Sequence, residues 1–209
     1  MKLYPQVLLL LISLFILNSC SVTKNFSRVK RPNKQVIAVL SSGYTTVLYK
    51  TSIDIKNNHF SGLFYFKKLD EEKYRIVFMA EMGLNLLEFE YNKGIFTTIN
   101  AQEFLNKKAL LNTLQNDLRL LIQSPTDYEK QKIFEHKSYP QVLIKIKSNS
   151  KRCYYFYNPN NELEKMVQKS SFNKVEFGIL KTIHKVPEKI EIHHKIMDIH
   201  IDLNLIKVK

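Results

Sequence analysis

The chain has 209 residues, with 32 Lys and Arg against 19 Asp and Glu, a formal net charge of +13 and two cysteines. Apolar residues make up 44% of the chain, which is enough for a folded core and excludes disorder over the whole length. The five glycines form no phosphate-binding motif. Two cysteines exclude a disulfide framework and a four-cysteine zinc site.

The first residues have the pattern of an export signal. Lys2 precedes an apolar run of 11 residues from Val7 to Leu17. A membrane-spanning helix needs about 20 such residues, whereas the apolar part of a signal peptide has about 7–15. We therefore expect residues 1–19 to be a signal peptide.

The end of this run, Leu17-Asn18-Ser19-Cys20, resembles the processing site of bacterial lipoproteins. The resemblance implies that Cys20 is acylated and becomes the new N-terminus, and Ser21 after it favours the outer membrane. Residues 20–32 would form a lipidated basic tether, and residues 33–209 the folded domain. Export argues against a nucleic-acid partner and leaves anionic lipids, an acidic protein or a solvated basic surface to explain the charge.

Apolar and polar residues alternate along most of the domain, which predicts antiparallel strands. Residues 33–42 fit either a short helix or a first strand. Asn92-Lys93-Gly94 is typical of a hairpin turn. The alternation predicts strands near residues 45–55, 60–66, 74–81, 87–91, 95–99, 131–137, 141–147, 152–158, 162–169, 174–185, 188–194 and 197–207.

The period changes once, between the two groups of strands. Asn100, with Glu103 three residues later, is typical of a helix N-terminus. Ser124-Pro125 ends the pattern, so we expect a helix of about six turns. Its apolar residues at helical spacing are Phe104, Leu111, Leu114, Leu118, Leu121 and Ile122.

These elements predict a mostly β (α+β) fold, a curled antiparallel incomplete β-barrel of about 11 strands with the long helix as a lid. One helix covers only part of so large a sheet, so an apolar cavity beneath it is a natural consequence. A fully packed core is the alternative. The candidates for lining the cavity are Phe64, Phe66, Ile76, Phe78, Phe89, Leu111 and Leu118.

Three segments resemble the LolB family of outer-membrane lipoprotein receptors. Tyr74–Glu90 (YRIVFMAEMGLNLLEFE) has the family's Tyr-Arg pair and apolar–acidic strand, and between them it has Met82-Gly83 where the family has a Leu-Gly corner. Phe60–Phe64 is similar to the small-residue strand before it, and Val186–Ile192 with Asp198–Leu203 is similar to the closing hairpin. The resemblance spans roughly residues 45–207 and rests on pattern rather than on an invariant motif.

The resemblance implies a monomeric half-barrel that holds acyl chains without bond chemistry, so we expect no enzyme activity, no catalytic residue and no cofactor. Its partners would be acylated lipoproteins or lipids, a LolA-like periplasmic carrier, and the outer membrane, which it faces from the periplasm. The corner Met82, Gly83 and Leu84 would contact the membrane. A core position for Met82 is the alternative.

Two other hypotheses remain open. Asp198, His200 and Asp202 share one strand face, and His193 and His194 lie just before them. Side chains in this pattern could hold a metal ion. A polar outer face of the strand explains the same pattern without a metal, and we expect no metal site. The second hypothesis is a noncatalytic envelope lipoprotein that acts as a docking or assembly factor, or that carries another hydrophobic ligand. An open apolar cavity favours the carrier, and a filled barrel favours the docking protein.

Overall fold

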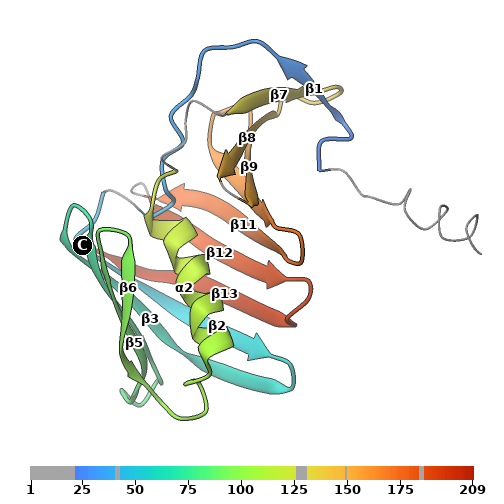
Figure 1. Ribbon diagram of the computed structural model, residues 1–209. Helices are drawn as coiled ribbons and strands as arrows, with labels where there is room; N and C mark the ends of the chain where they lie inside the picture. Colours follow the sequence, from blue (N-terminus) through green and yellow to red (C-terminus); the bar gives the residue numbers. More distant parts are fainter. Residues whose placement is uncertain (1–21, 41–42, 126–130, 149, 184–185) are drawn as a thin grey trace, which may run out of the picture.

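The computed structural model describes residues 22–40, 43–125, 131–148, 150–183 and 186–209 (Figure 1). Within these residues the chain forms thirteen strands in one antiparallel sheet and a single helix. No helix in this part of the chain is long and apolar enough to cross a membrane. The expectation of a mostly β protein with one helix is confirmed at this level.

The sheet consists of two meanders that meet in its middle. The first comprises β2 (Thr46–Ile55), β3 (Asn58–Asp70), β4 (Lys73–Met79), β5 (Asn85–Asn92) and β6 (Ile95–Ala101). The second comprises β7 (Lys132–His136), β8 (Val142–Ser148), β9 (Lys151–Tyr157), β10 (Leu163–Lys169), β11 (Lys174–Ile183), β12 (Val186–His194) and β13 (Ile199–Val208). The last strand pairs with β2, and β1 (Phe26–Val29) pairs with β7. The sheet curls but does not close, since β1 and β6 are its edges.

The thirteen strands exceed the about 11 expected for the barrel. The twelve ranges predicted from alternation coincide with β2 to β13 within a few residues, and β1 is the strand that was not predicted. The hairpin turn between β5 and β6 also forms where its sequence predicts it. Lys93 and Gly94 have φ angles of 45° and 89°, the left-handed conformation that a tight two-residue hairpin requires.

The helix is shorter than predicted. It is α2 (Lys108–Ile122), and its N-cap residue Lys107 makes no side-chain capping bond. The predicted start at Asn100 is wrong, because Asn100 and Ala101 end strand β6. The Asn100 side chain donates a hydrogen bond to the carbonyl of Asn85 at 3.4 Å, so pairing with the neighbouring strand outweighs the local capping pattern.

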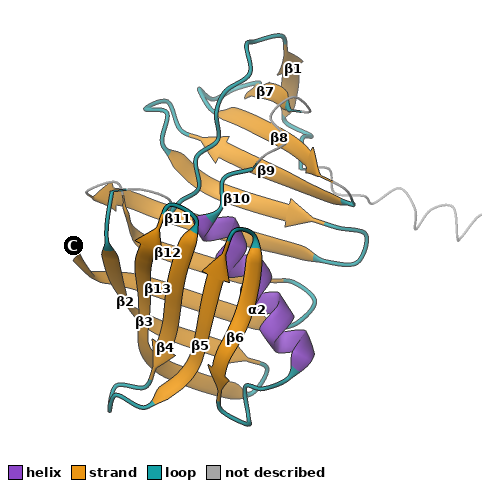
Figure 2. Ribbon diagram, turned by 60° about the vertical axis from the view of Figure 1, so that its left-hand side comes forward, coloured by secondary structure: helices purple, strands orange, loops and turns teal. Residues whose placement is uncertain are grey.

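The apolar face of α2 lies against the concave face of the sheet, which curls around it (Figures 1 and 2). The face is formed by Leu110, Leu114, Leu118, Leu121 and Ile122, all buried. Of the seven predicted cavity residues, Phe64, Phe66, Ile76, Phe78, Phe89 and Leu118 are buried in one core cluster, and Leu111 packs against it. They are core residues that pack against each other, because α2 lies directly on the strands that carry them.

We call β1, β7, β8 and β9 the wing, the part of the sheet that extends beyond α2 (Figure 1). Tyr154 and Phe156 face away from α2 and form a second, small core with Leu143 and Val167. Val22, Phe26 and Phe134 pack against this small core.

The segment predicted as a tether therefore lies partly in the fold. Phe26 packs edge-on against Phe156 with ring centres 5.8 Å apart, and its strand β1 pairs with β7. Residues 33–40 form neither the helix nor the strand that their sequence allows. Val36, Ala38 and Leu40 are buried in alternation, and the Leu40 amide donates to the carbonyl of Leu121 at 2.7 Å.

Gly62 in β3 offers a test of how tightly β3 and β4 are joined. A Cβ at this position would lie 2.1 Å from the carbonyl oxygen of Met79. Because that oxygen belongs to the backbone, we expect Gly62→Ala to lower the free energy of unfolding by about 1–3 kcal/mol. Urea denaturation of the unacylated Cys20→Ser chain measures it.

Gly178→Ala is the matched control, since its nearest neighbour, Glu191 Oε2 at 3.3 Å, belongs to a flexible side chain. We expect a change below about 1 kcal/mol there. Equal effects of the two substitutions would contradict the close approach at Gly62.

Candidate functional site

An open trough lies where α2 ends and the sheet continues. Its volume is about 470 Å³, and it separates the C-terminal half of α2 from the inner face of β8, β9 and β10. None of the seven predicted cavity residues lines it. The trough is lined by Asn116, Arg119, Leu120, Gln123, Ser124, Pro125, Ile146, Ser148, Ser150, Lys151, Cys153, Tyr155 and Gln168.

Apolar side chains from both layers meet in the trough. Leu120 comes from α2, and Ile146 and Tyr155 come from adjacent strands of the wing. Arg119 is held in place, because its guanidinium donates to the carbonyl of Gly94 at 2.5 Å and lies over the ring of Phe96. The trough therefore combines a few apolar side chains with a larger polar lining that includes the cationic Arg119 and Lys151.

A smaller pocket of about 190 Å³ adjoins the trough and shares Asn116, Lys151 and Gln168 with it. We call it the polar pocket. Lys151 Nζ donates to Asn116 Oδ1 at 3.3 Å, a hydrogen bond that links α2 to β9 at the boundary between the two hollows. The other residues lining the polar pocket are Thr113, Asp117, Ser170, Asn173, Val175 and His194.

A buried ionisable pair forms one wall of the polar pocket. Asp117 Oδ2 and His194 Nε2 lie 2.7 Å apart, with side chains 3% and 1% exposed. Burial raises the pKa of Asp117 above its usual value, and the hydrogen bond with His194 opposes that rise. The pair joins the middle of α2 to the end of β12.

The sequence contains a signal for this pair, although neither residue was predicted to be buried. Asp117 falls within the apolar stripe of α2, three residues after Leu114 and four before Leu121. His194 continues the inward alternation of Ile190 and Ile192, so the metal hypothesis is wrong to place it on the polar outer face with His193, which is exposed. A polar residue in phase with buried apolar neighbours predicts a buried partner.

The residues of the metal hypothesis lie outside the polar pocket, except for His194. His200 Nε2 lies 2.8 Å from Asp202 Oδ2, and the ring of His193 lies 3.8 Å from that of His200, tilted by 58°. Asp198 occupies the turn before β13 with a φ of 47°. Among the described residues, no group of three or more His, Cys, Asp or Glu side chains is arranged to hold a metal ion.

The Met82 corner is a tight turn at the end of β4. The Gly83 amide donates to the carbonyl of Ala80 at 2.8 Å, and Gly83 has a φ of 85° that favours glycine. Met82 is 96% exposed and Leu84 57% exposed, so Met82 is not the core residue that the alternative interpretation expected. The signal peptide and Cys20 lie outside the described residues.

The fold and site thus define an open, curled-sheet protein with a ligand-sized trough. No protein-family profile matches the chain, and no curated protein matches its sequence. A solved DUF1329 family protein from Desulfovibrio piger is similar in fold, with a TM-score of 0.50 and 9% identity over 81% of this chain and 87% of that chain.

Two other solved structures overlap less well. A candidate lipoprotein from Parabacteroides distasonis has a TM-score of 0.29 and 9% identity, over 84% of this chain and 100% of that chain. A candidate outer-membrane lipoprotein-sorting domain from Vibrio parahaemolyticus has a TM-score of 0.31 and 10% identity, over 81% of this chain and 86% of that chain. Only the first comparison supports a shared fold, and at this identity it says nothing of function.

Cys153 offers a chemical probe of the trough. Burial raises the pKa of its thiol, and a hydrogen bond from Gln168 opposes that rise. Little of the thiol is therefore ionised at neutral pH, so we expect Cys20→Ser protein to react with iodoacetamide at least about tenfold more slowly than an unfolded control. Mass spectrometry of alkylated protein over time measures the rate.

An ordinary cysteine has a pKa near 8.5, so its alkylation rate stops rising with pH once the thiol is fully ionised. We expect the alkylation rate of Cys153 to keep rising at higher pH. Equal rates for folded and unfolded protein would contradict the burial of Cys153.

Proposed function

We propose that this protein is a noncatalytic envelope lipoprotein that binds the acyl chain of a lipid or of an acylated protein in the trough beside α2. The observation that carries the proposal is the trough itself, an open hollow of about 470 Å³ with Leu120, Ile146 and Tyr155 on its walls. Ligand sites combine apolar side chains with polar groups that orient the ligand. In this trough the apolar side chains stand among a larger number of polar ones, among them Arg119 and Lys151, which suits an amphiphile with a polar or anionic part.

Acyl chains suit this site because their binding needs apolar area rather than specific contacts. Burial is worth about 0.8 kcal/mol per CH₂, so a few methylenes in the trough suffice for measurable affinity. The same reasoning favours a carrier over a permanent store. A trough that is open along one side contacts only part of a chain, so release to a second apolar surface costs little.

The LolB-like hypothesis adds a cellular setting. Cys20 would anchor the protein on the periplasmic side of the outer membrane, where it would receive acylated lipoproteins from a LolA-like carrier. The open curled sheet with a helix on its concave face supports this proposal. In it, the protein acts as a monomer without a cofactor, and no nucleic acid is involved.

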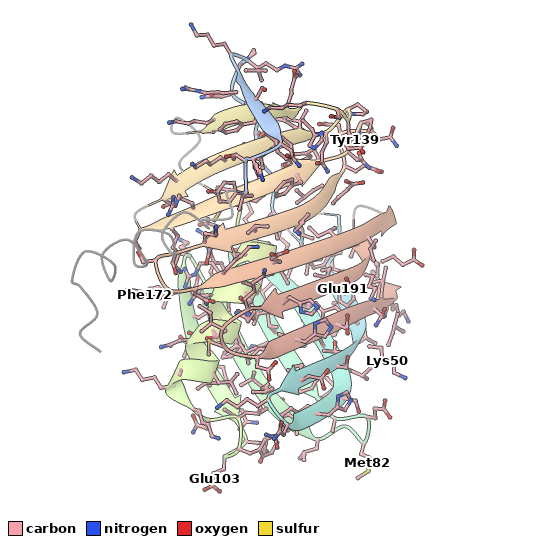
Figure 3. The ribbon with its side chains drawn as sticks, turned by 90° about the vertical axis from the view of Figure 1, so that its right-hand side faces the viewer. Lys50, Met82, Glu103, Tyr139, Phe172 and Glu191 are labelled. Carbon is pink, nitrogen blue, oxygen red and sulfur yellow. The ribbon has the colours of Figure 1, made fainter. Side chains whose placement is uncertain are left out.

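The wing and the Met82 corner lie at opposite ends of the molecule (Figure 3). Val22 packs against the small core of the wing. Figure 3 labels Tyr139, which follows β7 of the wing, and Met82 at opposite ends. Cys20 stands two residues before Val22 in the sequence, so in this proposal the anchor is at the wing end. With Cys20 in one bilayer, the Met82 corner is directed toward a second apolar surface unless the molecule lies along the membrane.

A docking lipoprotein is the second candidate. The packing of Phe64, Ile76 and Phe78 beneath α2 favours it, because the predicted cavity in that region is filled. The two candidates make different predictions for the trough. A carrier holds an acyl chain there, whereas a docking protein functions without a ligand in the trough.

Blocking the trough tests the proposal. In the Cys20→Ser chain, Cys153 is the only remaining cysteine and can be coupled to a long-chain maleimide under mild denaturation followed by refolding. We expect unmodified protein to retain lipid or acylated protein from bacterial membranes at near-stoichiometric level, and the coupled protein to lose it at least about tenfold. Mass spectrometry of organic extracts measures the bound lipid.

A chain with Cys153→Ser and Ser171→Cys, coupled in the same way, is the matched control. Ser171 is exposed in the turn between β10 and β11 and lines neither the trough nor the polar pocket. Empty unmodified protein, or equal loss in the control, would sink the carrier proposal and favour the docking protein.

The Met82 corner has its own test. Met82→Asp should weaken association of the Cys20→Ser chain with anionic vesicles by about tenfold, because a buried Met side chain contributes about 1.5–3 kcal/mol. Met82→Leu should retain it. Vesicle sedimentation measures association, and thermal unfolding should be unchanged in both variants because Met82 is 96% exposed. Equal association of the two variants would show that Met82 does not enter the membrane.

A further inference from the structure

Four cationic side chains lie on one face of the wing. Tyr154 of β9 faces away from α2, and Arg152 shares its face because alternate residues of a strand point the same way. Residues directly opposite each other on neighbouring strands share a face as well, which adds Lys145 and Lys147 of β8 and Lys132 of β7. We call Lys132, Lys145, Lys147 and Arg152 the basic face.

The basic face places like charges directly opposite each other. Lys132 is the partner of Lys145, and Lys147 is the partner of Arg152. Such pairs destabilise a sheet, whereas pairs of opposite charge stabilise it. Glu135 is the only acidic residue in β7, β8 and β9. It stands three residues after Lys132 in β7, so it points to the other face, and it forms an ion pair with Arg31.

The four charges are close enough to act on one another. Lys145 Nζ lies 5.6 Å from the centre of the Tyr154 ring. Burial lowers the pKa of the Lys145 ammonium below its usual value, and the charges of Arg152, Lys132 and Lys147 lower it further. Among the residues that the structure describes, none of the four cations forms an ion pair with an acid.

Elsewhere the sheet places opposite charges together. In the first meander, Arg75 is the partner of Glu90, and its guanidinium donates to that carboxylate at 3.1 Å. Beside the wing, Lys165 of β10 lies 2.6 Å from Glu176 of β11. The basic face departs from this arrangement, and a cluster of cations without acids is typical of a surface that binds an anionic partner.

The first described residues of the chain lie on the same side of the wing. Val22 and Phe26 pack against the small core that contains Tyr154, the residue opposite Lys145. Cys20 stands two residues before Val22 in the sequence. An acyl anchor at Cys20 would therefore hold this side of the wing near the bilayer surface. An acyl chain and a basic patch together give firmer membrane attachment than either alone.

We propose that the basic face lies on the anionic headgroups of the bilayer that holds the anchor. This rests on the proposed function, in which Cys20 carries the anchor. Anionic headgroups would relieve the repulsion between the opposed cations. The position of Val22 favours a membrane over an acidic protein, because the anchor keeps this side of the wing at the bilayer whether or not a second protein is present.

The strength of this contact depends on charge and on salt. Each Lys or Arg near an anionic bilayer contributes about fivefold to the association constant. The screening length falls from about 10 Å in 0.1 M salt to about 3 Å in 1 M salt, so high salt should abolish the contribution. An apolar contact of the Met82 corner is not screened in this way, so salt separates the two.

Lys132→Gln combined with Arg152→Gln is the deciding variant. Both side chains are exposed, and the change removes one cation from each opposed pair, so the unfolding temperature should not fall. Association is measured by sedimentation with vesicles of phosphatidylcholine alone and of equal parts phosphatidylcholine and phosphatidylglycerol. The parent is the chain with Cys20→Ser and Met82→Asp, in which neither the anchor nor the Met82 corner contributes.

We expect the double variant to bind the anionic vesicles at least about tenfold more weakly than its parent in 0.1 M salt, and equally weakly in 1 M salt. The parent should bind phosphatidylcholine vesicles no better than the variant does. Lys67→Gln with Lys207→Gln is the matched control, since it removes the same charge from exposed residues of β3 and β13. The control should change association by less than about twofold.

Labelling of lysines in the acylated chain gives a second readout. Acetic anhydride should modify Lys132 and Lys147 more slowly on anionic vesicles than on phosphatidylcholine vesicles, and Lys67 at the same rate on both. Mass spectrometry of peptides measures the rates. Equal labelling of Lys132 and Lys147 on the two kinds of vesicle would contradict their contact with the headgroups.

Equal weakening by the double variant and the control would overturn the proposal, because the net charge alone would then explain association. A double variant that binds vesicles like its parent but is no longer retained on an immobilised acidic polypeptide would assign the basic face to an acidic protein instead. The acyl-binding function is tested separately, since the double variant should retain lipid in the trough as its parent does. An empty trough with vesicle association intact would overturn only the acyl-binding function.

Discussion

The pairing of β13 with β2 is the interaction on which the rest of the structure depends. It joins the last strand of the chain to the first meander, from Ile199 opposite Ile55 to Val208 opposite Val47. Without this ladder the two meanders would be separate sheets, and α2 would have no continuous concave face to cover. The pairing also brings the end of β12 beneath the middle of α2, which is where Asp117 and His194 meet.

The location of the trough follows from the length of α2. The helix has 15 residues, about 22 Å at 1.5 Å per residue, and it covers the centre of a thirteen-stranded sheet. Beyond Ile122 the inner face of β8 and β9 is open at the trough. Residues 33–40 lie elsewhere, near Tyr157 at the end of β9 and residues of β10 to β12. The position of α2 also explains why the predicted cavity is filled. Most of the residues predicted to line it belong to strands directly beneath α2, and the apolar face of α2 packs on them.

Local pattern was sufficient to predict most of the strands and the reversal between β5 and β6, because alternation and turn chemistry are properties of neighbouring residues. Local pattern gives the wrong element at Asn100. The hydrogen bond from the Asn100 side chain to the Asn85 carbonyl joins two neighbouring strands, and a local pattern contains no information about that pairing. Phe26 is a similar case. Its sequence neighbours are basic and polar, and only its contact with Phe156 across the wing makes it part of the fold.

The candidate site was harder to predict than the fold. Phe64 and Ile76 were assigned to a cavity because they are apolar and face inward, and the same properties describe a packed core residue. Which inward surface is left open depends on which strands α2 covers, and this follows from the strand order, which no local sequence pattern contains. Asp117 and His194 are different, since their positions within apolar stripes could have shown that both are buried.

Locating a bound acyl chain is the most direct test of ligand binding in the trough. A fatty acid with a spin label near its methyl end, added to protein with labelled isoleucine methyl groups, broadens the signals of residues close to it. We expect broadening of Ile146, which lines the trough, and no change at Ile76 in the core beneath α2. Broadening of Ile76 with Ile146 unaffected would place the chain beneath α2 and contradict the assignment of the trough.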